Sequence, residues 1–443
     1  MKANFIYSNL NPCGGGERFT LVTMHAVTEM GIEIELTTLE NPNISKLENA
    51  FGKDLASVMK QLRKINVLQM FDQESVNSNI SNNDYDIIIN THGDIDPYYN
   101  PGLTKENTIT YCHYPSAKSF IEEEDANYFE YHLRINRINS SFVLPTSDDS
   151  ASVVKFSMSS LSPIRKSVNH KVKINDFDKK RQYIDWVKYT YDKMIRNSLL
   201  ITNSYYSRRA IFETYGIDDI VVLSPPVDVD AIRTKVGLSS LATSASEHRD
   251  NLVLVICRIE PSKKIENAVY LARRLKERKI RVKMIMAGSL DPFYQEYYDN
   301  LKKLIADNEI SDNILFRIDT SFEELIELMK GSKVFFHPRE GEHFGMSIVE
   351  AMSAGLVPVV PSIGGQTEFV PTKYQYSSLE QALQIVTSAL DITDKERHRI
   401  SDSVRRFSET NYKRQFQLII SKLIYDVGII RHYDFHHLHA INK

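Results

Sequence analysis

The sequence predicts an α/β protein built from two doubly wound parallel-sheet domains. Short apolar strands alternate with amphipathic helices along the chain, which is typical of parallel sheets covered by helices on both faces. The alternation forms two series, and a stretch of small and polar residues at 229–250 separates them as a linker would. A chain of 443 residues is also too long for one ordinary hydrophobic core.

The first series opens with a strand at 4–9 and a glycine-rich segment, NPCGGGER, at 11–18. It closes at Pro225 and Pro226, which stop regular structure. Between these points the sequence predicts helices at 19–30 and 207–216 and strands at 85–90, 108–114 and 198–204.

The second series predicts a further sheet. Open sheets of this kind bind ligands beyond the carboxyl ends of their strands, so we expect the loops of both domains to face a central cleft. We place a first domain at 1–227, a second at 228–425 and a tail at 426–443. The predicted strands lie at 251–259, 281–288, 313–318, 333–338 and 356–360, and the helices at 263–278, 291–308, 321–331 and 345–354.

The totals exclude several classes of protein. A net charge of -3 argues against a general nucleic-acid binder, which would be strongly basic. Three scattered cysteines fit neither a disulfide framework nor a zinc cluster, and they favour a reducing, cytoplasmic setting. The first residues show no signal-peptide pattern, and no apolar run approaches the ~20 residues that span a bilayer.

The segment 151–200 departs from this balance. It holds eleven lysine and arginine residues against four aspartates, together with Trp186 in a helical stretch. One interpretation is a solvated helical insertion, since charge runs commonly serve solubility. The other is a patch that contacts an anionic membrane surface, where tryptophan favours the interface.

The stretch EGEHFGMSIVEAM, residues 340–352, predicts a binding site for a diphosphate. Gly341 and Gly345 let the backbone approach a ligand, because no side chain intervenes. The helix that follows offers its first free N–H groups, from Phe344 and Gly345 to Met346 and Ser347, and the positive end of its dipole.

Charged side chains complete this predicted site. Glu342 and Glu350 are too far apart to act on one bond, and they suit hydrogen bonds from hydroxyl groups at the two ends of a nucleotide sugar. Arg258 and Lys263, followed by Lys264, come after the strand at 251–259 and could neutralise a diphosphate.

Taken together, these motifs resemble retaining, nucleotide-sugar-dependent glycosyltransferases of family 4, which have the GT-B fold. EHFGMSIVE resembles their Glu-x7-Glu motif, RIEPSKK their Arg…Lys diphosphate clamp, and PPVD their inter-domain junction. NPCGGGER and YCHYP resemble one branch, the enzymes that add α-1,2-mannose to dolichol-diphosphate-linked oligosaccharide. The resemblance runs from residue 7 to about 371.

The resemblance implies a role for each matching residue. Glu342 would bind hydroxyls of the donor sugar and Glu350 the ribose, while Arg258 and Lys263, or Lys264 after a one-residue shift, would hold the diphosphate. His113 would face the donor sugar. The glycine-rich loop would approach the donor phosphates and the acceptor through Gly14, Gly15 and Gly16.

The resemblance also implies a mechanism and partners. The acceptor hydroxyl would attack on the leaving-group face, and a donor phosphate oxygen would take its proton, with no protein nucleophile, cofactor or metal. We expect transfer of a hexose, mannose from GDP-mannose, to a lipid-linked glycan, on the cytoplasmic face of a membrane that the segment 151–200 could contact.

Other interpretations remain open at this stage. Nothing in EHFGMSIVE separates guanine from uracil, so a UDP-sugar with a soluble acceptor, an epimerase of similar fold, or a non-catalytic sugar-nucleotide-binding protein are alternatives. His113 alone would more often be a hydrogen-bonded structural histidine. The histidine-rich tail, RHYDFHHLH, lacks the spacing of metal ligands.

Overall fold

The protein is described here from a computed structural model. The described residues are 1–69, 73–93, 107–122, 128–135, 141–143, 153–155, 176–238 and 249–426. Most of the basic segment between 144 and 175, part of the predicted linker and the histidine-rich tail therefore lie outside the described residues.

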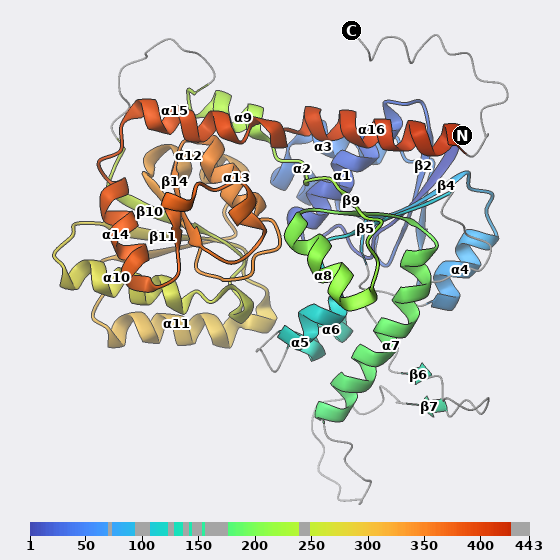
Figure 1. The fold of residues 1–443 in the computed structure, drawn as a ribbon, viewed down its shortest axis with the longest axis horizontal. Coiled ribbons are helices and arrows are strands. Elements are labelled where there is room, and N and C mark those ends of the chain that lie inside the picture. The colour runs from blue at the N-terminus through green and yellow to red at the C-terminus, as the bar shows by residue number, and fades with distance from the viewer. Residues whose placement is uncertain are drawn as a thin grey trace, which may run out of the picture.

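The first half of the chain forms a parallel sheet in the order β3-β2-β1-β4-β5-β8-β9. In Figure 1 this sheet and its helices occupy the right-hand side. Its strands are β1 (Lys2–Ile6), β2 (Glu33–Thr38), β3 (Lys64–Val67), β4 (Ile87–Asn90), β5 (Thr108–Cys112), β8 (Leu199–Thr202) and β9 (Val221–Val222). The helices are α1 (Gly15–Thr28), α2 (Ile44–Phe51), α3 (Lys53–Ala56), α4 (Gln73–Ser81), α5 (Ser116–Glu122), α6 (Tyr128–Ile135), α7 (Asp176–Arg196) and α8 (Tyr205–Tyr215).

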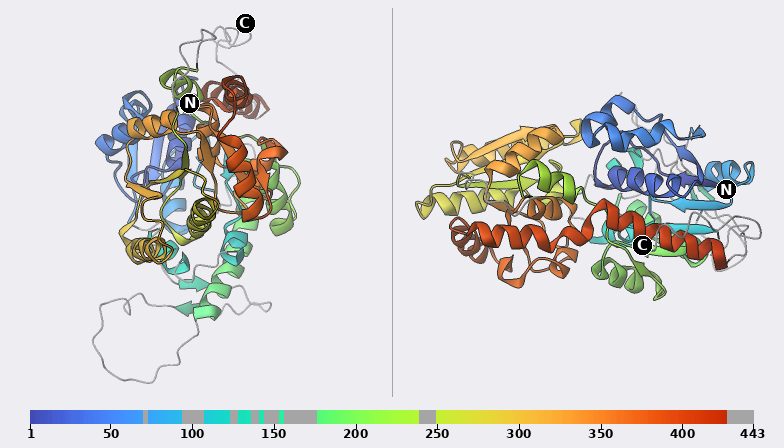
Figure 2. Two further views of the ribbon diagram at one scale, coloured as in Figure 1. Left: turned by 90° about the vertical axis from the view of Figure 1, so that its left-hand side faces the viewer. Right: turned by 90° about the horizontal axis from the view of Figure 1, so that it is seen from above.

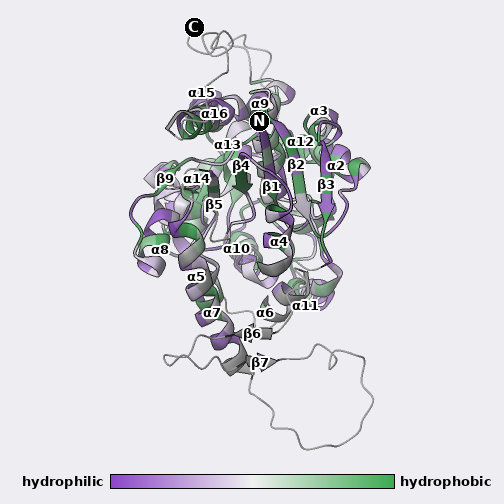
Figure 3. Cartoon of the chain, turned by 90° about the vertical axis from the view of Figure 1, so that its right-hand side faces the viewer, coloured by the Kyte–Doolittle hydropathy of each residue, from purple (hydrophilic) through white to green (hydrophobic). Residues whose placement is uncertain are grey.

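The central strands of this sheet are apolar, which explains why they are buried on both faces. All four residues of β4, an Ile-Ile-Ile-Asn run, are buried, as expected for a central strand covered on both faces. The edge strand β3 instead has exposed residues at both ends, Lys64 and Val67, and a single buried residue, Asn66. Figure 3 shows the contrast, with hydrophobic colour on β4 and hydrophilic colour on β3.

The second half forms another parallel sheet, in the order β12-β11-β10-β13-β14-β15. The strands are β10 (Leu252–Ile256), β11 (Lys283–Gly288), β12 (Ile314–Ile318), β13 (Val334–Phe336), β14 (Val357–Pro361) and β15 (Gln375–Tyr376). The helices are α9 (Val229–Lys235), α10 (Glu266–Glu277), α11 (Gln295–Asp307), α12 (Phe322–Gly331), α13 (Met346–Ser353), α14 (Leu379–Ala389), α15 (Asp394–Ser403) and α16 (Glu409–Asp426).

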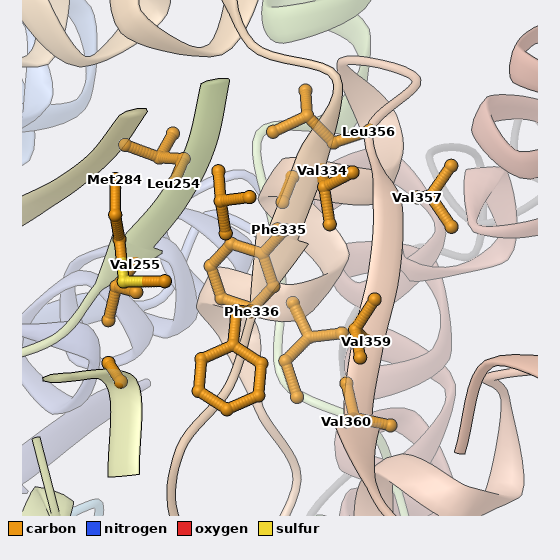
Figure 4. Close-up of a cluster of buried hydrophobic side chains, with 14 of the residues drawn as sticks. Leu254, Val255, Met284, Val334, Phe335, Phe336, Leu356, Val357, Val359 and Val360 are labelled. Atoms are coloured by element: carbon orange, nitrogen blue, oxygen red, sulfur yellow. The ribbon is translucent and has the colours of Figure 1, made fainter. Parts of the chain in front are cut away.

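The core of the second sheet lies around its central strands. Phe335 and Phe336 of β13 are completely buried, and burial of each side chain contributes about 1.5–3 kcal/mol. Figure 4 shows these rings among Leu254, Val255, Met284, Val334, Leu356, Val357, Val359 and Val360. This packing fixes the strands whose carboxyl ends carry the predicted diphosphate site.

The predicted linker is wrong in its first part. Residues 229–235 form helix α9, capped by the side chain of Asp228, which accepts a hydrogen bond from the N–H of Ala231 at 3.4 Å. Val229 and Ile232 are completely buried in the core of the second sheet. Two apolar residues three positions apart, after a capping aspartate, outweigh the polar composition of the rest of the stretch.

The last described helix returns to the first sheet. In Figure 1 α16 runs from the second sheet across the top of the first, and the view from above in Figure 2 shows the same course. Its buried residues recur every fourth position, and they belong to the core that contains α1: Tyr412, Phe416, Ile420 and Ile424. The domain boundaries expected from the sequence stay a prediction, and α16 joins the two sheets whichever boundary is drawn.

Helix α7 carries the described part of the basic segment. In Figures 1 and 2 it extends away from the body of the protein next to the short strands β6 (Ser141–Val143) and β7 (Val153–Lys155). Tyr183, Val187 and Tyr191 are buried, and Trp186 is partly buried against the same cluster. The tryptophan therefore packs on the protein.

Candidate functional site

The predicted cations and the predicted carboxylate Glu342 follow neighbouring strands. Strand β10 pairs in parallel with β13, and the chain order reverses between them, which makes this the switch point of the second sheet. Arg258 and Lys263 follow β10, and Glu342 follows β13. Ligands of open α/β sheets bind at such a point.

Lys263 and Glu342 form an ion pair. The Lys263 Nζ lies 3.5 Å from Oε2 of Glu342, and both side chains are 16% exposed. Burial alone would raise the pKa of Glu342, but Lys263 and the nearby His337 outweigh it and hold the pKa well below its ordinary value. Glu342 is therefore an ionised carboxylate, which acts only as a hydrogen-bond acceptor.

Arg258 is directed by a second carboxylate. Its Nη2 lies 3.1 Å from Oε1 of Glu260, and the guanidinium side chain is 58% exposed while that of Glu260 is 7% exposed. Glu260 is fixed in turn by the hydroxyl of Ser262, which donates to it at 2.6 Å. Because one carboxylate positions an otherwise exposed guanidinium, Arg258 retains donors for a ligand.

The charge of Arg258 reaches the first sheet. Burial and the carboxylate of Glu17 raise the pKa of Tyr7, and the positive charge of Arg258 opposes that rise. Burial and Asp291 likewise raise the pKa of Tyr131 in α6, again against Arg258. Arg258 therefore lies at the boundary between the two sheets, and we call this boundary, from Gly15 and Tyr114 to Met346 and Arg258, the inter-sheet junction.

The start of α13 has the geometry expected of an anion site. Gly345 caps the helix with φ 98°, a left-handed conformation that favours glycine. The N–H groups of Ile348 and Val349 donate to the carbonyl of Gly345 at 3.1 and 3.2 Å. The amides of Met346 and Ser347 precede these first helical bonds and are available to an anion.

Phe344 takes part in this site only through its backbone. Its side chain is 5% exposed. The ring packs against Phe369 and Phe407, with ring centroids 5.2 and 5.3 Å away. The side chain thus anchors the loop to the core of the second sheet.

The three glycines of the first sheet have different surroundings. A Cβ atom on Gly15 would lie 3.0 Å from Sδ of Met346, so this glycine lets the loop approach the start of α13. Gly14 instead donates to Oε2 of Glu17 at 2.5 Å. A Cβ on Gly16 would lie 2.5 Å from the hydroxyl of Tyr7. Gly15 therefore faces the second sheet, whereas Gly14 and Gly16 pack within the first.

His113 is held within the first sheet. Its Nε2 donates to the carbonyl of Thr91 at 3.0 Å. The ring makes edge contacts with Phe19 and Tyr111, at centroid distances of 5.2 and 4.9 Å. Burial lowers the pKa of His113 to about 4, so the imidazole is neutral at neutral pH. This geometry fits the structural alternative, and a role toward the donor sugar stays a prediction.

Glu350 lies in a different charged group from Glu342. Burial raises its pKa, Arg18 opposes the rise, and Asp228 adds to it. Arg18 of the glycine-rich segment pairs with Asp228 at 3.2 Å and with Glu409 at 2.5 Å. Glu350 thus lies where α1, α16 and the segment that follows Pro226 converge.

Lys264, the alternative to Lys263, lies at the end of the short 3₁₀ helix η3 (Pro261–Lys263) and has a left-handed φ of 51°.

The residues that join the loop around His343 to the first sheet were not indicated by any of the sequence motifs. The rings of Tyr114 and His343 stack with centroids 3.8 Å apart and an interplanar angle of 4°. The hydroxyl of Ser204 lies 2.7 Å from the carbonyl of His343. Tyr114 and Ser204 each come two residues after a strand, and His343 lies in the loop that follows β13. These positions are a signal that the sequence did contain, but their pairing depends on how the sheets meet.

A carboxylate of the second sheet makes a further contact across the junction. Glu368 follows Gly365 in the 3₁₀ helix η5 (Gly365–Glu368) and accepts hydrogen bonds from the N–H groups of Tyr205 and Tyr206 at 3.2 and 2.8 Å. These donors begin helix α8, where a negative charge is favourable. The contact fixes the segment Gly365–Glu368 of the second sheet against the first sheet.

Comparison with known proteins supports this architecture. The profile of the family "Glycosyl transferases group 1" matches residues 240–407. A glycosyltransferase from Rickettsia africae has a TM-score of 0.61 at 14% identity, covering 96% of this chain and 98% of that chain. Anabaena HepE in complex with UDP has a TM-score of 0.60 at 15% identity, covering 95% of this chain and 100% of that chain.

A curated relative extends the similarity to the first sheet. The GDP-Man:Man(3)GlcNAc(2)-PP-Dol alpha-1,2-mannosyltransferase of Dictyostelium discoideum is 25% identical over 329 residues, covering 71% of this chain. The match spans 59% of the length of that relative. The chain has the GT-B fold, and residues 240–407 are similar to the glycosyl transferases group 1. The resemblance and the fold class expected from the motifs are thus confirmed.

Proposed function

We propose that the protein is a retaining glycosyltransferase that transfers a hexose from a nucleotide-diphosphate sugar to a glycan acceptor. One observation carries the proposal: Arg258 and Lys263 follow β10 at the switch point of the second sheet, where Lys263 pairs with an ionised Glu342 just before the start of α13. Two cations and free helix amides complement a diphosphate, and the carboxylate complements sugar hydroxyls.

The proposed chemistry is transfer without a protein nucleophile. The bond between the sugar C1 and the donor phosphate breaks, the acceptor hydroxyl bonds to C1 on the same face, and a donor phosphate oxygen receives its proton. Arg258 and Lys263 stabilise the charge that develops on the leaving diphosphate, where preorganised donors act most strongly. The residues of the chain supply this charge, so we expect no metal requirement.

We further propose that the donor is GDP-mannose and that the acceptor is a lipid-linked glycan. The name of the Dictyostelium relative contains both GDP-Man and a PP-Dol acceptor, and it supports this choice by similarity. A UDP-sugar is the alternative, because the Anabaena structure is described as a complex with UDP.

A thermal-shift screen in the presence of a chelator tests the donor proposal. Ligand at 100 times its dissociation constant stabilises a protein by about 2.7 kcal/mol, so GDP-mannose is expected to raise the unfolding midpoint more than UDP- or ADP-sugars do. GMP, which lacks the second phosphate, is the control and should give a smaller shift than GDP. Equal shifts for GMP and GDP would contradict the diphosphate site, and a shift seen only with added metal would contradict metal independence.

Lipid vesicles test the acceptor proposal through membrane contact. Among the described residues no helix is both long and apolar enough to cross a membrane. On α7, Tyr189 is 46% exposed and Arg181 is exposed, so part of the basic segment is available to a surface. Each basic residue near an anionic surface contributes about 1 kcal/mol.

The protein is therefore expected to sediment with vesicles that contain phosphatidylserine at low salt, and to be released as salt screens the attraction. Neutral phosphatidylcholine vesicles are the control. Absence of sedimentation with anionic vesicles at low salt would favour a soluble acceptor.

A further inference from the structure

His337 is a buried polar residue at the end of the central strand β13. It is 2% exposed. Its N–H donates to the carbonyl of Val359 at 2.9 Å, and its carbonyl accepts from the hydroxyl of Tyr376 at 2.8 Å. Strand β14 and the side chain of Tyr376 in β15 therefore fix its backbone, and the ring has little freedom to move away from what it faces.

The ring of His337 faces the Glu342 carboxylate. Its Nε2 lies 3.4 Å from Oε2 of Glu342. Neither ring nitrogen makes a hydrogen bond to any residue that the structure describes. A buried imidazole without hydrogen bonds is unfavourable, and such groups in native proteins call for an explanation. A small approach of Glu342 would complete the bond to Nε2.

Lys263 competes for the same oxygen of Glu342. Its Nζ lies 3.5 Å from Oε2, on which His337 also converges. If Lys263 holds a donor diphosphate, the greater charge of that group attracts the ammonium away from the carboxylate. The N–H of His343 still donates to Oε1 of Glu342 at 3.2 Å, but Oε2 then needs another partner to keep its position.

The surrounding charges suit a neutral ring in that role. The charged groups facing His337 are Lys263, Arg339 and Glu342; burial and the two cations lower its pKa, and Glu342 opposes them. A neutral imidazole carries one N–H, and the Nε2 position is the one directed at Glu342.

We propose that His337 is a positioning residue: its Nε2–H donates to Glu342 and holds the carboxylate toward the hydroxyls of the donor sugar while Lys263 holds the diphosphate. This inference rests on the proposed function. It adds to the site a residue that touches neither the donor nor the acceptor and acts through Glu342.

Substitution of His337 by glutamine or by asparagine tests the inference, because the two side chains place their amide group at different distances from the backbone. In His337→Gln the side-chain amide can place an N–H near the position of Nε2, whereas in His337→Asn it reaches only the position of Nδ1. His337→Asn is expected to weaken binding of GDP-mannose about tenfold, because a hydrogen bond to a charged group is lost, while binding of GDP stays within about threefold. His337→Gln should bind both ligands within about threefold of the unsubstituted protein.

Calorimetric titration of the two ligands measures this pattern. Equal weakening of GDP and GDP-mannose, or equal behaviour of the Gln and Asn variants, would overturn the role of His337. If the unsubstituted protein binds UDP-glucose instead, UDP and UDP-glucose replace the GDP pair. Absence of binding by any nucleotide sugar would overturn the proposed function itself.

The variant Lys263→Met removes the ammonium that competes for Glu342, and it therefore tests the hydrogen bond without ligand. Nitrogen-15 spectra of the histidine rings should show His337 as the Nε2–H tautomer, assigned by its absence from His337→Gln. The Nε2–H proton signal should persist in Lys263→Met and be lost or shifted in Glu342→Ala. An Nδ1–H tautomer, or a signal unchanged in Glu342→Ala, would overturn the proposed bond.

Discussion

Lys263→Ala is expected to lower kcat/KM for the nucleotide sugar about 100- to 1,000-fold, the loss typical when one preorganised donor to a developing anion is removed. The structure gives a second reason. Lys263 balances Glu342, and both side chains are only 16% exposed, so the substitution also leaves a largely buried carboxylate without its ammonium partner. Donor turnover measured over a range of donor concentrations gives the ratio directly.

Lys264→Ala is the matched control for that experiment. It removes the same side chain one position later, at a residue with φ of 51°, and neither alanine nor lysine is favoured over the other in this conformation. We expect a change in kcat/KM of less than about threefold, typical of a surface substitution. A larger loss in Lys264→Ala than in Lys263→Ala would assign the diphosphate contact to Lys264, the alternative that the sequence left open.

The sequence predicted best what a single strand and its loop determine. Arg258, Lys263 and Glu342 lie in the loops that follow two apolar strands, and parallel strands bring such loops to one edge of a sheet. Gly345 was predicted at the start of a helix, and it is the N-cap residue of α13. These inferences needed only local patterns and one rule of topology.

Contacts between the two sheets could not be predicted in this way. The stack of Tyr114 on His343 and the approach of Gly15 to Met346 join segments more than two hundred residues apart. Their geometry depends on how the two sheets pack against each other, and the sequence motifs carry no information about that packing. The same limit applies to α16, which lies in the predicted second domain and packs in the core of the first sheet.

The direction in which a side chain points also could not be predicted from the sequence. Phe344 was expected to offer its backbone N–H to a diphosphate, and nothing in the sequence indicated that its ring packs against Phe369 and Phe407. Conversely, His337 ends a strand of three completely buried residues, Val334, Phe335 and Phe336, and was not singled out. A polar residue that ends such a strand, five positions before a predicted carboxylate, was the available signal.

Gly365→Ala is expected to displace the loop that carries Glu342. A Cβ atom at this position would lie 2.0 Å from the carbonyl oxygen of His343, and rotation of a side chain cannot relieve a clash with backbone. The backbone N–H of Gly365 also donates to the carbonyl of Glu342 at 2.7 Å, so a shift of one segment moves the other. Misplacement of a binding group by about 1 Å can cost about 100-fold in rate, and we expect a loss of that size in kcat/KM.

Gly331→Ala is the control for this substitution, because its Cβ would meet only Leu252 Cδ1 at an ordinary 4.0 Å. We expect Gly365→Ala to lower the free energy of unfolding by about 1–3 kcal/mol through overpacking. Gly331→Ala should raise it by about 0.4–1 kcal/mol, because alanine fits this helical position and restricts the unfolded chain. Urea unfolding gives both values. Normal kcat/KM in a folded Gly365→Ala variant would show that the loop can yield without moving Glu342, and the proposed dependence of the donor site on this close backbone contact would then be wrong.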